Sequence, residues 1–462
     1  MNRPFATSLI EGQLPKHLQT VHRSRPRLWT SFAVLFFLML GIGWIPEELL
    51  KLPALHSVSV GELLLMAAVS LNWRAVFGRL ASPQSRTFVD TIMVVLLIFV
   101  TLNIVRNISA GYPLEEVLRN SRRMFYYTFY FLLVASIRDR ELLVKAVKIL
   151  TVLFMVGALS YFITLLFDVP LASRIVYSYG AEAESFPRVY HVIFPMAVVV
   201  GFIHFSMLLT GVRQVYGVSS RAAFMTATLL VYLSYYRNYY VTYLVGLLVI
   251  AMAEGCLRPR ALVRAGATLV FVATVVLGGL SLVGVLGPTI ERMGTLGIEA
   301  SDLSGTVASR IVIWGIRYDT ISSINPLLGA GFIWEQDPDR TTEDVILDPL
   351  VPDNDNGYAA ALVLLGFVGI ALFVLLYLAV LRLAAGLLRS QPRDIERVLS
   401  ISSVGLAVYV LMNNIGLDNF YWPYAVLPNL VLLGALNAGV LLERKRTKCG
   451  EGWGPELARS GS

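Results

Sequence analysis

The stretch VPDNDNGYAAALVLLGFVGIALFVLLYLAVLRLAAG, residues 351–386, decides the fold class. About thirty apolar residues follow its polar start, broken only by Arg382, and a helix of that length is more than enough to cross ~30 Å of hydrocarbon. The polar segment DNDN, residues 353–356, lies at the mouth of this span. Charge is costly at such a depth, so the cluster needs a reason beyond solubility.

Similar apolar runs recur along the whole chain of 462 residues, 56% of which are hydrophobic. Soluble proteins rarely exceed half, and the alternating pattern of a membrane barrel is absent. The sequence therefore predicts an all-α, polytopic membrane protein with about twelve transmembrane helices. We expect these spans near residues 28–45, 57–72, 88–105, 124–137, 142–167, 190–210, 222–236, 238–253, 262–286, 355–388, 398–415 and 422–442.

The charges between the spans predict the orientation of the chain. Arginine and lysine gather in both tails and in the even-numbered loops, which the positive-inside rule assigns to the cytoplasm. We therefore expect cytoplasmic tails at 1–27 and 443–462, transmembrane helices at 28–286 and 355–442, and one large outer loop with helical segments at 287–354.

One loop breaks this charge rule. Four arginines between the third and fourth expected spans fall on the outer side, namely Arg106, Arg119, Arg122 and Arg123. The exception indicates either an amphipathic segment on the membrane surface or a miscounted span.

Several function classes are disfavoured by the sequence. The net charge of +7 lies in short loops between spans, so topology rather than nucleic-acid binding explains it. No P-loop or dinucleotide fingerprint is present, which argues against an ATP-driven pump. The five histidines show no metal-ligand spacing, and the two cysteines indicate no disulfide framework. We expect no metal and no cofactor.

Arginine near the outer side is the strongest candidate for binding chemistry. Arg188 lies where a span begins, Arg237 lies among apolar and tyrosine residues, and Arg310 opens a helix of the outer loop. A guanidinium stays charged, and its planar fork suits diphosphate oxygens. Each residue also has a structural interpretation. Arg188 can be an interfacial anchor, and Arg237 can belong to an internal ion pair or to a turn between two short spans. Arg310 can lie on a solvated helix face.

Other polar residues have the same two interpretations. His191, one helical turn after Arg188, is either a hydrogen-bonded structural residue or part of a site. The tyrosines between 232 and 243 are either an interfacial belt or the lining of a polar cavity. The polar residues that close the eleventh expected span (Asn413, Asn414, Asp418 and Asn419) form a cap and an outer turn, or face a site.

Two segments carry a family resemblance: SRIVIWGIRYDTISSINPLLGAGF, residues 309–332, and DNGYAAALVLLGFVG, residues 355–369. They resemble the signature of the bacterial O-antigen ligase and O-antigen polymerase superfamily. That signature is an Arg-x-x-x-Trp helix, a Pro-x-x-Gly-x-Gly turn, then His-Asn-x-Tyr and a Leu/Gly-rich span. The matching residues are Arg310, Trp314, Pro326, Gly329, Gly331, Asn356, Tyr358, Leu362, Gly366 and Gly369, and Arg188 and Arg237 fit the arginines that the family carries earlier.

The resemblance implies a GT-C-like, lipid-carrier-dependent glycosyltransferase of the bacterial inner membrane. It would move an oligosaccharide from an undecaprenyl-type polyprenyl diphosphate to an acceptor sugar hydroxyl at the periplasmic face. Arg188, Arg237 and Arg310 would bind the diphosphate. The implied partners are the lipid-linked oligosaccharide, the acceptor glycan and membrane lipid, with a chain-length regulator as a further candidate.

One departure bears on the type of enzyme. The family's ligases carry a histidine before the asparagine, whereas this chain carries Asp355. An aspartate can act as a general base within hydrogen-bonding reach of the acceptor, and the alternatives for it are a helix cap or an acceptor contact. The change favours a polymerase of surface polysaccharide over a ligase that transfers glycan to lipid A core. The further candidate contacts with acceptor or glycan are His191, Asp353, Asn356, Tyr358 and Trp314.

A different class of protein shares some of these features. A transporter or flippase of lipid-linked glycan would also use buried arginines and a polar helix mouth. The inverted repeat of many transporters is not evident in the sequence, and the long structured loop on one face also argues against this class.

Overall fold

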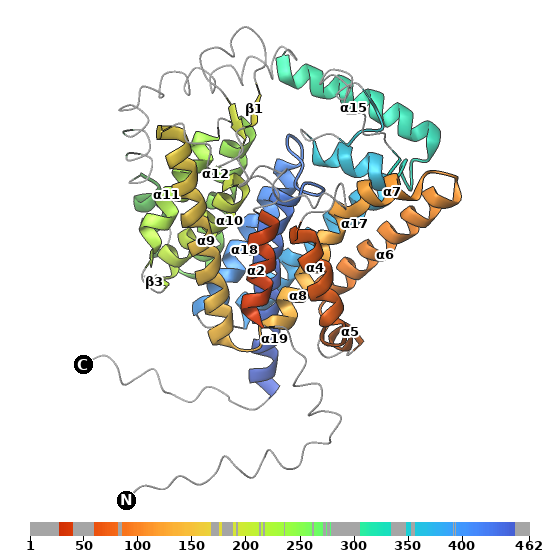
Figure 1. Ribbon diagram of the computed structural model, residues 1–462. Coiled ribbons are helices and arrows are strands. Elements are labelled where there is room, and N and C mark those ends of the chain that lie inside the picture. The colour runs from red at the N-terminus through yellow and green to blue at the C-terminus, as the bar shows by residue number, and fades with distance from the viewer. Residues whose placement is uncertain are drawn as a thin grey trace, which may run out of the picture.

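The computed structural model shows a bundle of helices with two short hairpins (Figure 1). It describes residues 27–39, 60–81, 86–167, 175–177, 188–190, 193–211, 214–215, 218–234, 236–260, 263–270, 274, 278, 305–333, 348–352, 356–390, 392 and 394–448. The helices of the first half are α2 (Leu28–Met39), α4 (Val60–Leu71), α5 (Trp73–Ala81), α6 (Phe88–Ser109), α7 (Leu114–Ser121), the 3-10 helix η4 (Arg122–Tyr127), α8 (Thr128–Ser136), α9 (Arg140–Phe167) and α10 (Ile193–Thr210). Those of the second half are α11 (Ser220–Leu233), α12 (Arg237–Leu257), α15 (Gly305–Ile324), α17 (Gly357–Arg389), α18 (Asp394–Asn413) and α19 (Pro423–Lys448).

The strands are short and do not change the fold class. β1 (Ile175–Tyr177) pairs antiparallel with β2 (Arg188–Tyr190), and β3 (Gln214–Val215) pairs antiparallel with β4 (Val218–Ser219). Among the described residues, 7 helices are long and apolar enough to cross a membrane: α6, α9, α10, α12, α17, α18 and α19. The predicted all-α, polytopic membrane architecture is therefore confirmed.

Helix α18 lies at the centre of the bundle, in contact with α10, α12, α17 and α19. Small residues on its surface allow this close packing. Gly405 packs against Ile250 of α12, so that an added Cβ would lie 2.5 Å from the Ile250 side chain. The Ser402 hydroxyl donates a hydrogen bond to the backbone oxygen of Val398 in the same helix and contacts Ser206 Oγ of α10 at 2.9 Å. The buried hydroxyl is thus satisfied without water.

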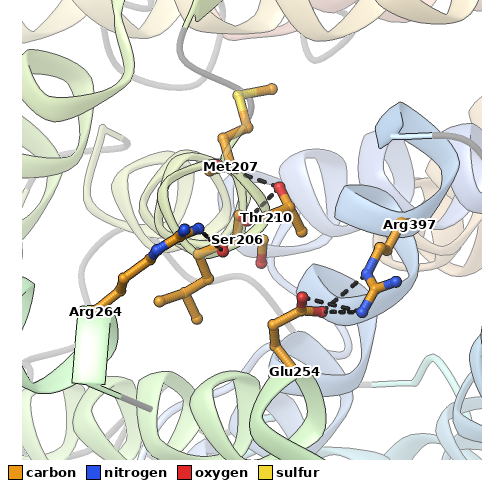
Figure 2. Close-up of polar contacts among 7 residues, drawn as sticks. Ser206, Met207, Thr210, Glu254, Arg264 and Arg397 are labelled. Atoms are coloured by element: carbon orange, nitrogen blue, oxygen red, sulfur yellow. Dashed lines mark hydrogen bonds and ion pairs between the residues drawn. The ribbon is translucent and has the colours of Figure 1, made fainter. Parts of the chain in front are cut away.

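One end of the bundle, here called the Arg397 end, is held by ion pairs between helix termini. Figure 2 shows Glu254 of α12 facing Arg397 of α18. The guanidinium donates from Nε to Oε2 at 2.9 Å and from Nη2 to Oε1 at 3.0 Å, a bidentate geometry. Arg140 of α9 lies 3.6 Å from Glu396 at the same end. Positive residues of the loops predicted to be cytoplasmic therefore gather at one end of the molecule.

The opposite end, here called the Asn356 end, carries the first residues of α17 and the last of α18 (Figure 1). Helix α15 lies across it and packs against α17. Helix α7 is a short, separate helix at this end, whose Leu114 and Leu118 are exposed while Val117 is buried. This matches the amphipathic segment that the unusual outer arginines indicated, and it contains Arg119, with Arg122 and Arg123 following in η4.

Candidate functional site

Helix α17 is broken in its first half, and another part of the chain fills the break. Gly366 has φ 63° and ψ −163°, so the intrahelical hydrogen bonds stop there. In an apolar surrounding, the freed backbone groups need partners. The turn at 325–333 supplies them: Phe367 N–H donates to Pro326 O at 2.9 Å, and Ala330 N–H donates to Val363 O at 2.8 Å.

The glycines of the Pro-x-x-Gly-x-Gly turn make this insertion feasible. Gly329 has φ +69° and Gly331 has φ +91°, conformations that side-chain-bearing residues rarely adopt. A Cβ at Gly329 would lie 2.6 Å from Val363 O, and one at Gly366 would lie 2.5 Å from Gly329 N. The two backbones therefore approach each other more closely than any residue but glycine permits.

Side chains of α6 and α7 hold the inserted turn from the other side. Arg106 Nη2 donates to Gly329 O at 2.8 Å. Asn107 donates from Nδ2 to Ala330 O at 3.0 Å and accepts from Phe332 N–H at 3.2 Å. Asn120 of α7 donates to Phe332 O at 3.3 Å. Arg106, one of the four outer arginines, is thus part of the support of this turn.

The end of α18 brings together two segments that carry predicted site residues. Asn238, the second residue of α12, donates to Asn413 O at 2.8 Å and to Asn413 Oδ1 at 2.7 Å. Asn356, just before α17, donates to Ile415 O at 3.0 Å. The turn at 413–415 therefore joins the start of α12, whose first residue is Arg237, to the residue that follows Asp355.

Asn356 and Tyr358 have defined structural partners. Asn356, 1% exposed, caps α17 by accepting from the backbone N–H groups of Tyr358 and Ala359, each at 3.1 Å. The Tyr358 hydroxyl donates to Leu411 O at 2.7 Å. Both residues fix α17 against α18, and their predicted contact with glycan stays a prediction.

Arg317 of α15 is a residue that the sequence reasoning missed. It is 2% exposed, and its Nη2 donates to Val351 O at 3.2 Å, just ahead of the DNDN segment. It follows Arg310 and Trp314 at intervals of four and three residues, which places all three on one side of the helix. That spacing was the signal for it. This buried guanidinium therefore fixes α15 to the backbone at Val351.

The remaining predicted residues are placed only in part. Asp353, Asp355 and His191 lie outside the described residues, and the structure gives the backbone but not the side chains of Arg188, Arg237 and Arg310. Arg188 lies in β2, opposite Tyr177, shortly before α10. Arg237 begins α12 after the turn from α11, so it stands between two helices rather than inside a span.

The tyrosines near Arg237 do not form the expected interfacial belt. Tyr239, Tyr240 and Tyr243 are 2%, 5% and 2% exposed. They are buried because α12 packs against both α10 and α18, so Tyr243 stacks on Phe202 and Tyr239 lies against Tyr409. The belt interpretation is wrong for these three residues.

The turn between α18 and α19 adds further buried polar groups at the Asn356 end. Asp418 Oδ1 accepts from the N–H groups of Phe420 at 2.7 Å and Tyr421 at 3.0 Å. Burial raises the pKa of Tyr421 to about 12, so its phenol stays protonated and donates to Asn120 O at 2.8 Å. Among the described residues, no three His, Cys, Asp or Glu side chains are grouped to hold a metal ion.

The polar groups of the Asn356 end thus come from α6, α7, α12, α15, α17 and α18. Residues 222–374 match the family model of O-antigen ligase. The match runs from α11 into α17 and contains Arg237, Arg310 and Asp355, whereas Arg188 and His191 precede it. It confirms the predicted resemblance to the O-antigen ligase and polymerase superfamily over this segment. No curated protein matches the chain.

The inserted turn, the break at Gly366 and the cap at Asn356 all lie inside the matched segment. The structure therefore gives the signature glycines and asparagine of the O-antigen ligase family a physical role in this chain. They let one loop enter a broken helix and fix that helix to its neighbours. The match supports a function of O-antigen ligase or polymerase type in general.

Proposed function

We propose that the protein is a polymerase of surface polysaccharide that uses a polyprenyl diphosphate carrier. The observation that carries this proposal is the joining of α12 and α17 at the turn 413–415, inside and next to the segment that matches O-antigen ligase. It brings the backbone of Arg237 and the neighbour of Asp355 to one place at the Asn356 end.

The proposed reaction is a glycosyl transfer in which diphosphate leaves. The bond between the anomeric carbon and the diphosphate oxygen breaks, and the acceptor hydroxyl oxygen forms the new bond to that carbon. Asp355 takes the proton of the hydroxyl as general base. Arg188, Arg237 and Arg310 neutralise the charge that develops on the leaving diphosphate. Arg237 suits this role because the positive end of the α12 dipole adds to its charge.

The choice of polymerase over ligase rests on Asp355. A histidine precedes the asparagine in the ligases of the family, and this chain has an aspartate there. In the polymerase form, the acceptor is a glycan on its own lipid carrier. In the ligase form, the acceptor is lipid A core.

The proposal includes a location for the reaction. The Arg397 end, rich in positive loop residues, faces the cytoplasm together with both termini. The Asn356 end then faces the periplasm from a bacterial inner membrane, and an undecaprenyl-type carrier brings the glycan to it. A chain-length regulator is a further proposed partner.

The first test is the surface-glycan ladder of a deletion strain, together with a count of repeat units on the lipid carrier. We expect surface glycans reduced to one repeat unit. Long chains retained on the carrier would instead identify a ligase. An unchanged ladder with normal carrier-linked glycan would contradict both forms.

The second test concerns the residues. Asp355→Ala and Arg237→Ala should abolish polymerisation in complemented cells while the protein still inserts into the membrane. Arg382→Ala is the matched control, since Arg382 is exposed in the second half of α17. Normal ladders in either site variant would refute the assignment of that residue.

A further inference from the structure

Three arginines at the Asn356 end are not used by the proposed reaction. Arg119 belongs to α7, and Arg122 and Arg123 begin η4. Intervals of three and four residues bring side chains to the same side of a helical segment. We call these three residues the α7–η4 arginines.

Two aromatic rings, those of Tyr421 and Trp422, lie against one of these residues, Arg123, and are called the aromatic floor. The guanidinium carbon of Arg123 lies 3.8 Å from the ring centre of Trp422 and 5.2 Å from that of Tyr421. Such stacking holds the guanidinium in place, and Arg123 also forms a side-chain hydrogen bond with Tyr421. The Tyr421 hydroxyl is already engaged with Asn120 O at 2.8 Å, so the floor is fixed to α7.

The α7–η4 arginines form one ion pair among the described residues, although Glu115 and Glu116 lie one turn before Arg119 in α7. Glu62 is the carboxylate that pairs with them among the described residues, with its Oε1 3.6 Å from Arg122 Nε. The same oxygen accepts the Tyr126 hydroxyl at 2.5 Å, so its charge is shared. Within the described part of the chain, Arg119 and Arg123 form no ion pair.

Three donors in this group are buried and have no hydrogen-bond partner among the described residues. They are Arg119 Nε, Arg122 Nη1 and Trp422 Nε1. A buried donor without an acceptor is destabilising, and an uncompensated charge near a membrane is more so. Such donors are tolerated when a ligand supplies the acceptors. An aromatic ring beside several guanidinium groups suits a phosphate that carries a sugar.

We propose that the α7–η4 arginines and Trp422 bind the diphosphate of a second lipid-linked glycan, the acceptor. This inference rests on the proposed polymerase function, in which donor and acceptor both carry a polyprenyl diphosphate. Arg188, Arg237 and Arg310 then hold the donor.

The position of the group supports a role beside the central site. Asn120, between Arg119 and Arg122 in the chain, donates to Phe332 O of the inserted turn at 3.3 Å. Trp422 follows the turn that begins at Asn413, where α12 is joined to α18. An acceptor bound there would have its sugar close to the start of α17.

The test counts bound prenyl diphosphate by native mass spectrometry. Purified full-length protein in nanodiscs of zwitterionic phosphatidylcholine is titrated with farnesyl diphosphate. We expect two molecules bound to the wild type. The double variant Arg119→Gln/Arg123→Gln should retain the molecule in the donor site and bind the molecule in the acceptor site at least tenfold more weakly. Arg237→Gln should lose the molecule in the donor site. Arg382→Gln, far from both sites, should retain two.

Two single variants distinguish loss of binding from failure to fold. Arg119 has no hydrogen bond or ion pair to a described residue, so Arg119→Gln alone should fold normally and still weaken one site. Trp422→Phe keeps an aromatic ring and removes the Nε1 donor together with the five-membered ring of the indole, and it should weaken the same site. Two full-affinity molecules in these variants would overturn the inference.

Two further experiments are needed. One distinguishes a carrier diphosphate from an ordinary lipid headgroup, and the other distinguishes failure of this site from failure of the proposed function. Nanodiscs with phosphatidylglycerol should not displace the second farnesyl diphosphate, and displacement would overturn the carrier in favour of an ordinary anionic lipid headgroup. In a polymerisation assay, Arg119→Gln should raise the KM for the acceptor lipid and leave that for the donor unchanged. A protein that binds two prenyl diphosphates but makes no polymer would refute the proposed function and not this site. A polymerase with an unchanged acceptor KM would refute the site and not the function.

Discussion

Replacing Gly366 with alanine should destabilise the protein through both backbone strain and a clash with the inserted turn. The backbone there has φ 63° and ψ −163°, a region that is almost confined to glycine, and holding alanine in it costs ~1–3 kcal/mol. The new Cβ would also lie 2.5 Å from Gly329 N, which is backbone and cannot turn aside. The inserted turn must therefore shift.

The shift adds a second contribution. Four hydrogen bonds join the turn to α17, including Phe367 N–H to Pro326 O at 2.9 Å and Val368 N–H to Leu327 O at 3.2 Å. Each buried backbone group that loses its partner costs ~1–3 kcal/mol. If strain adds to the loss of a single bond, the expected destabilisation is ~2–6 kcal/mol.

The assay is thermal unfolding in detergent, followed by circular dichroism at a fixed detergent-to-protein ratio. Gly386→Ala is the matched control, because Gly386 lies in the same helix with no atom within 4 Å of an added Cβ. Alanine there should be neutral or stabilising by ~0.5–1 kcal/mol, since it favours the helix. Equal melting temperatures for the two variants would refute the account of the broken helix.

Three more predictions concern side chains that join helices. Glu254→Gln breaks the buried ion pair with Arg397 and should destabilise the protein by ~3–5 kcal/mol. Glu141→Gln, in an exposed pair, should leave the melting temperature unchanged. Equal effects of the two variants would contradict the stabilising role of the Glu254–Arg397 pair. Asn107→Ala removes two hydrogen bonds to the inserted turn and should destabilise by ~1–3 kcal/mol, with faster amide exchange at 330–332; unchanged exchange would argue against its role as a support. Asn356→Ala should lose ~1 kcal/mol of capping energy in addition to the hydrogen bond to Ile415 O, while Asn356→Ser, which also loses that bond, keeps a cap acceptor and should melt higher than Asn356→Ala, so the reverse order would refute the cap.

The helices of the bundle could be predicted because hydropathy is a local property. The run from Gly357 has the length and composition of a membrane helix whatever surrounds it, and α17 spans Gly357–Arg389. The length of an apolar run predicted a single long helix less well where polar residues interrupt the run. The expected span at 124–137 forms the 3-10 helix η4 and the short helix α8 instead of one long helix.

The break in α17 could not be predicted from α17 alone. Gly366 adopts its conformation because Leu327 and Gly329, from a turn almost forty residues earlier, fill the gap. The sequence showed glycines in a span, and their conformation depends on tertiary contact. Asn107 was missed for the same reason, since both of its hydrogen bonds reach more than two hundred residues along the chain.

The candidate site was predicted by residue type and family pattern rather than by geometry. Asn413 was expected as a cap with a site role as the alternative, and only its pairing with Asn238, 175 residues away, shows that it joins α12 to α18. The outer arginines were recognised because they broke the charge rule. The stacking of Arg123 on Trp422 depends on the turn after α18, which no local pattern links to α7.

The most direct test of the central claim is glycan transfer by the purified protein. Full-length protein in nanodiscs is supplied with one lipid-linked repeat unit, and both the length of the carrier-bound glycan and the release of free polyprenyl diphosphate are measured. The account predicts chains that lengthen as one diphosphate carrier is released per added unit, with no growth in the Asp355→Ala variant. No growth and no released carrier with wild-type protein, in the presence of a second repeat unit as acceptor, would contradict it.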